Sequence, residues 1–76
     1  MGPTFSGPPI YTTHSRERME ERHVSDAEVR AVIADPDTTW TDGAGNPVLR
    51  KEVLGRKIKV VIAKGGNHAV VITVAD

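Results

Sequence analysis

The sequence predicts an α+β fold in which two N-terminal helices pack on a four-stranded antiparallel β-meander. Residues 14–34 carry helical spacing and capping signals, whereas residues 38–75 alternate between β-branched segments and glycine-rich turns. With 76 residues, 38% of them hydrophobic, the chain suits one small core. Residues 1–9 hold three prolines and two glycines. We therefore expect a flexible N-terminal arm over 1–9 and a single domain over 10–76.

Two helices are expected before the strands. The first should run from about residue 14 to residue 22, after a short extended piece at 10–12, with Thr12 or Thr13 as its N-cap. The second should follow Ser25, whose hydroxyl and the Glu28 carboxylate have the spacing of a capping box. It should end near residue 34, because a proline at position 36 disfavours helical backbone before it.

Four strands should follow the helices. The first covers residues 38–41, and turn residues at 42–47 lead into a hairpin of strands 48–54 and 57–63 around Gly55-Arg56. Residues 65–67 make the next turn, and the last strand covers 68–75, with strict alternation of its two faces.

The alternation of apolar and polar residues assigns the two faces of strand 57–63 but not those of strand 48–54. Ile58, Val60 and Ile62 should face the helices, which leaves the lysines at 57 and 59 on the other side. In the preceding strand neither alternating set is wholly apolar, so either Arg50 or Lys51 could lie beside the first helix.

Composition excludes several classes of protein. Ten basic and ten acidic residues cancel, so no overall field draws the chain to nucleic acid or membranes, and any phosphate binding must be local. Neither DNA nor a membrane is expected as a partner. The absence of cysteine excludes disulfides, thiolate catalysis and cysteine-ligated zinc, and no histidine or acidic pattern has zinc-like spacing. No cofactor motif and no long apolar segment or secretory signal is visible, so we expect a cytoplasmic protein without metal or cofactor.

His14, Arg18 and Arg22 form the most informative pattern, since four-residue steps place them on one stripe of the first helix. The stripe either binds an anion or forms surface ion pairs with glutamates at 17, 20 and 21. His14 is the only acid–base candidate in the helix, with capping or a structural hydrogen bond as its alternative role. If Arg50 or Lys51 lies nearby, the cations would converge on an anion site with Tyr11 at its edge.

The other histidines and the tryptophan are expected to be structural. His23 should lie in the turn between the helices, and His68 should open the last strand. Trp40 is expected in the core or at a sheet edge rather than as a platform for stacked bases.

Several segments together resemble a known family. They are Thr12-Thr13-His14, Arg18-Met19-Glu20-Glu21-Arg22, Val24-Ser25, Pro36 and the closing Val70-Val71-Ile72-Thr73-Val74. From about Ile10 to Val74 the chain resembles the family called domain of unknown function 4258. Such domains are similar to RelE-like and BrnT-like toxins, in which helices precede an antiparallel sheet (a RelE-like or BECR-type small domain) and RNA is cleaved without metal.

The resemblance implies a metal-independent endoribonuclease that acts on RNA and pairs with an antitoxin. His14 would then be the acid or base, and Arg18 and Arg22 would hold the scissile phosphate. The expected placement of the first helix beside the sheet adds Tyr11, Arg50 and Lys51 as substrate-binding residues.

Two alternatives remain. Such toxins are commonly basic, whereas this chain is neutral, which favours a non-catalytic interaction module. That module would dock on an antitoxin, a second copy of itself or a larger assembly through a sheet edge or the first helix. A sensor of small anions that uses the same basic stripe is the other alternative.

Overall fold

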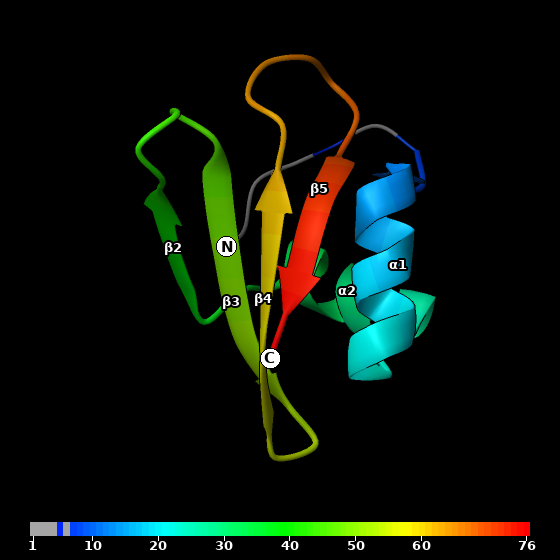
Figure 1. The fold of residues 1–76 in the computed structure, drawn as a ribbon. Helices are drawn as coiled ribbons and strands as arrows, with labels where there is room; N and C mark the ends of the chain where they lie inside the picture. The colour runs from blue at the N-terminus through cyan, green and yellow to red at the C-terminus, as the bar shows by residue number, and fades with distance from the viewer. Residues whose placement is uncertain (1–4, 6) are drawn as a thin grey trace.

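The computed structural model describes Phe5 and residues 7–76. The other positions of the expected arm, 1–4 and 6, lie outside the described residues, and Phe5 packs against the core. The elements follow one another as strands and helices in the order shown in Figure 1. They are β1 (Ile10–Tyr11), α1 (Thr13–Arg22), α2 (Asp26–Ala34), β2 (Thr38–Thr41), β3 (Pro47–Val53), β4 (Arg56–Ile62) and β5 (Val70–Ala75).

The sheet has five strands in the order β1-β5-β4-β3-β2, and it is mixed. The α+β class is as predicted, but the four-stranded antiparallel meander was wrong, because Ile10 and Tyr11 pair in parallel with Val70 and Val71. β2 to β5 are antiparallel neighbours. A two-residue strand has no alternating pattern of its own. Its pairing depends on a strand 60 positions away in register, which local sequence cannot indicate.

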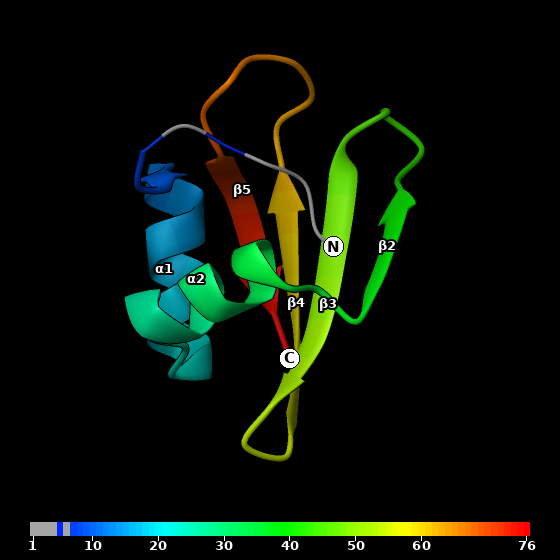
Figure 2. The ribbon, with the colours of Figure 1, turned by 180° about the vertical axis from the view of Figure 1, so that it is seen from behind.

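The two helices occupy different places against the sheet. α1 contacts β5 and lies along that side of the sheet, whereas α2 contacts β3 and β4 and lies on the side of the sheet that is at the rear in Figure 1 and in front in Figure 2. Their predicted starts are confirmed. Thr12 accepts a hydrogen bond from the Ser15 amide at 3.1 Å, and Ser25 and Glu28 form the complete capping box. No helix in the described part of the chain is long and apolar enough to cross a bilayer.

The core lies between the sheet and the helices. Ile58, Val60 and Ile62 are fully buried there, as predicted. Leu49 belongs to the same cluster, and alternation along β3 therefore places Lys51 on the helix-covered face and Arg50 on the other. This second face, which none of the helices in the described residues covers, is called the open face below.

The β3–β4 turn falls one residue earlier than predicted. Its central residues are Leu54 and Gly55, with φ angles of 51° and 82°, so both have the left-handed backbone of a type I′ turn. The predicted connection, Gly55-Arg56, was a two-residue turn with glycine first, whereas in the structure the first turn position is held by Leu54, a residue type uncommon at positive φ. The shift makes Arg56 the first residue of β4, opposite Val53 on the helix-covered face.

β5 also departs from the predicted strict alternation and starts at Val70 instead of residue 68. Val71 and Val74, three residues apart, are both buried in the core. The cause is a register irregularity between Val61 and Ile62, which shifts the pairing of β4 with β5 by one residue.

Three carboxylates accept backbone amides that would otherwise be unsatisfied. Glu28 accepts from the Ser25 amide at 2.9 Å, Asp37 from Glu52 at 2.9 Å, and Asp42 from Asn46 at 2.8 Å. In each case this backbone hydrogen bond is the main cause that lowers the pKa of the carboxyl below its ordinary value. The charged form of each group is thus favoured by folding.

We expect acid to destabilise the protein. Because the folded-state pKa values are lowered, the stabilisation is complete above the unfolded values of 4.5 for Glu28 and 3.8 for Asp37 and Asp42, and it is lost as the pH falls through the folded values. For each proton taken up on unfolding, the equilibrium constant for unfolding should rise about tenfold for each unit by which the pH falls. Urea denaturation across this range measures it, and Glu28→Gln should flatten the curve. A constant free energy of unfolding below about pH 4 would contradict the prediction.

Candidate functional site

The basic residues of the chain divide into two groups by their partners. Seven of the ten interact with an acidic group, a carbonyl oxygen or an aromatic ring. The seven are Arg16, Arg18, Arg22, Arg30, Lys51, Arg56 and Lys64. The exceptions are Arg50, Lys57 and Lys59. Within the described residues none of the three forms an ion pair or a side-chain hydrogen bond.

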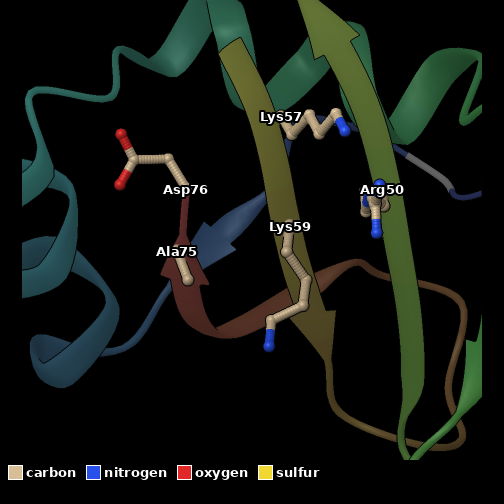
Figure 3. A pocket seen from close by; sticks show the side chains of 5 residues that line it. All are labelled: Arg50, Lys57, Lys59, Ala75 and Asp76. Atoms are coloured by element: carbon tan, nitrogen blue, oxygen red, sulfur yellow. The ribbon is translucent and has the colours of Figure 1, made fainter.

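These three cations lie together on the open face. Arg50 and Lys59 are directly opposite each other on β3 and β4, and Lys57 precedes Lys59 by two residues on the same face, where it is opposite Glu52. With Ala75 and Asp76 they line a shallow depression of about 400 Å³ (Figure 3). Like charges placed directly opposite in a sheet repel each other. A bound anion would relieve this repulsion.

Of the described residues that line the depression, Asp76 is the acidic one, and its carboxylate interacts with groups outside the depression. Its side chain points away from the three cations (Figure 3). Arg56 donates to one carboxylate oxygen at 2.7 Å, and Arg22 lies 3.8 Å from the other. The hydrogen bond from Arg56 is the main cause that lowers the pKa of Asp76. The carboxylate therefore does little to cancel the positive potential of Arg50, Lys57 and Lys59.

Arg56 connects Asp76, at the rim of the depression, to both helices. It donates to the carbonyl oxygens of Arg22 at 2.6 Å and His23 at 2.8 Å. Carbonyl groups at the end of a helix have no partner within the helix, and Arg56 supplies one here. It also lies 3.4 Å from the Glu28 carboxylate on α2. Its hydrogen bond to Asp76 is the main cause that raises its own pKa.

The predicted stripe of His14, Arg18 and Arg22 is present on α1. His14 is exposed, whereas Arg18 pairs with Glu21 at 3.2 Å and Arg22 pairs with Asp76. The pair with Asp76 brings Arg22 to the rim of the depression. His14 lies two turns away, about 12 Å along the helix axis.

Tyr11 and Lys51 do not join these residues. The Tyr11 hydroxyl donates to Asp26 on α2, and the Arg16 guanidinium lies 5.3 Å from the centre of its ring. Burial first, and then the hydrogen bond to Asp26, raise the pKa of Tyr11. Lys51 lies on the helix-covered face, 3.6 Å from Asp35 and 3.4 Å from the next acidic side chain, at position 37.

Of the two sheet residues predicted at the site, Arg50 borders the depression and Lys51 does not. Lys57 and Lys59, which were not predicted at a site, border it together with Arg50. The signal that could have found them is the register of the hairpin. Around the predicted Gly55-Arg56 turn, Arg50 would have faced Val61 instead of Lys59. Because the turn was predicted one residue too late, the predicted register did not bring Arg50 opposite Lys59.

The remaining candidate residues have structural positions. His23 is the C-cap of α1, with left-handed backbone at φ 54°, and His68 lies in the loop before β5. Across the described residues, no three histidine, cysteine or acidic side chains are grouped closely enough to hold a metal ion.

Comparison with the curated proteins and with the solved structures finds no match to this chain. A family model does match, over residues 11–76, which include α1, α2 and every strand that lines the depression. The model describes a domain of unknown function, DUF4258. The chain therefore belongs to the DUF4258 family.

Proposed function

We propose that this protein acts on RNA as a metal-independent endoribonuclease and that its open sheet face holds the phosphodiester backbone. The observation that carries the proposal is the depression lined by Arg50, Lys57 and Lys59, which form no ion pair within the described residues, although Glu52 lies opposite Lys57 in the register. A chain of zero net charge has little nonspecific attraction for polyanions, so such a local cluster matters more than the total charge.

Phosphate is the anion that this arrangement suits best. Guanidinium groups bind phosphate oxygens through two parallel hydrogen bonds, and ammonium groups act as point charges beside them. The cations come from two adjacent strands, so they can contact successive phosphates along a chain crossing the sheet. The depression is open and shallow, which suits a polymer better than an enclosed small molecule.

The cleavage step is assigned to the α1 stripe. His14 would move the proton of the 2′-hydroxyl or of the leaving oxygen, and Arg18 would stabilise the charge that develops on the phosphorane. Arg22, at the rim of the depression, would hold the backbone between the two regions. The ion pairs of Arg18 and Arg22 are solvent-exposed, so exchanging them for phosphate costs little.

A second candidate is a non-catalytic interaction module. All four residues of β2 are exposed, and β2 is an edge strand with one sheet neighbour. A strand from an antitoxin or from a second copy of the chain could pair with that edge. RNA binding or partner binding without any cleavage by the wild-type protein would favour this candidate.

Binding to single-stranded RNA should depend on the open-face cations. Replacing Arg50, Lys57 and Lys59 together by glutamine should weaken binding by a factor of about ten or more. It should also reduce the slope of log affinity against log salt concentration by about 2. Fluorescence anisotropy at several salt concentrations measures both. The matched control replaces Arg16, Arg30 and Lys64, which lie elsewhere and have partners. Equal losses in both triple variants would contradict a site on the open face.

Cleavage should depend on His14. We expect His14→Ala to reduce the single-turnover rate of RNA cleavage by a factor of about 100 or more, with the thermal midpoint nearly unchanged because the side chain is exposed. The assay contains excess chelator, since the proposed reaction needs no metal. His23→Asn is the matched control, because asparagine tolerates the left-handed backbone at that position. Wild-type rates in His14→Ala, or loss of all cleavage on chelation, would overturn the assignment.

A further inference from the structure

We infer that the open face selects single-stranded RNA over duplex RNA, with Trp40 as the side chain on which a base stacks. The inference rests on the proposed binding of RNA and adds the class of RNA to it. It assigns a ligand-binding role to a residue outside the depression.

The register of the sheet places Trp40 on the open face. Trp40 is directly opposite Val48 on β3, and Val48 is opposite Val61 on β4. Both valines are buried, yet neither belongs to the core cluster under the helices. Side chains of directly paired residues share a face, so Trp40 lies on the same side of the sheet as Arg50.

Trp40 is also accessible. It is 42% exposed, although tryptophan is on average among the more buried residue types. Among the described residues, β2 is the last strand of the sheet and has β3 as its single sheet neighbour. A base approaching from solvent can therefore reach the indole ring.

The aromatic side chain and the nearest cation are diagonal neighbours. Arg50 lies two residues beyond Val48 on β3, and such diagonal pairs have Cα atoms about 7–8 Å apart. A sheet face with an exposed aromatic residue beside cations can stack a base and hold phosphates at the same time. The order across the face is then Trp40 on β2, Arg50 on β3, and the lysines on β4.

Only an unpaired strand gains from this arrangement. In an A-form duplex the bases are stacked on one another and shielded, so a protein contacts mainly phosphates and 2′-hydroxyls. Arg50, Lys57 and Lys59 alone would attract single strands, duplexes and polyphosphate by charge. Trp40 would add affinity for the single strand and for none of the others.

The test compares wild-type protein with Trp40→Leu and Trp40→Phe. The probes are a short unstructured RNA, its duplex, the DNA strand of the same sequence, and inorganic polyphosphate. Anisotropy and competition give the affinities, and the emission of Trp40, the one tryptophan of the chain, reports stacking directly. We expect Trp40→Leu to weaken binding to the single strand about tenfold and Trp40→Phe much less, with affinity for polyphosphate unchanged in both. Single-stranded RNA should quench the emission of the wild-type protein, and polyphosphate should not.

Different failures are separable. If no probe binds the wild-type protein, the proposed RNA function and this inference both fail. If polyphosphate binds but the duplex binds as tightly as the single strand and emission is unchanged, the inference alone fails. Equal losses for all probes in Trp40→Leu would show a structural role and overturn it. If that variant does not fold, Trp40→Phe and the quenching of the wild-type protein decide. DNA bound as tightly as RNA would overturn the restriction to RNA.

Discussion

The side chain of Arg56 joins the ends of four elements. Its guanidinium binds the last carbonyl groups of α1, the Glu28 carboxylate on α2, and Asp76 after β5, while its backbone begins β4. A planar group with five donors can satisfy several acceptors at once, which a lysine at this position could not do with the same geometry. The contact ties the C-terminal end of α1 to the end of β5, while the Thr12 hydroxyl ties the start of α1 to the carbonyls of Val71 and Ile72.

The same contact determines how charge is distributed. Arg56 and Arg22 hold the Asp76 carboxylate toward α1, and the acidic residues at 35 and 37 are engaged by Lys51 behind the sheet. Asp76 is therefore held away from the open-face cations, and Glu52, opposite Lys57, is an acidic residue that the register places on their face. A chain with ten positive and ten negative residues thus presents one locally basic face, which its net charge of zero conceals.

Local signals in the sequence were sufficient for the helices, the central strands and the face of Ile58. They were insufficient where the structure depends on distant or unusual backbone. β1 pairs with a strand near the other end of the chain, and the type I′ turn places Leu54 at positive φ. That turn fixes the hairpin register, and the register brings Arg50 opposite Lys59. The α1 stripe was predictable from spacing alone, whereas the cluster on the open face required the register.

The most direct measurement of the central claim is a titration of isotope-labelled protein with a short single-stranded RNA, followed by amide chemical shifts. If the open face is the binding surface, the largest changes should occur on β3 and β4 around Arg50, Lys57 and Lys59, and at Ala75 on β5. The amides of α2, on the covered side of the sheet, should change least. Changes confined to α1, or a spectrum unaltered by RNA at saturating concentration, would contradict the assignment.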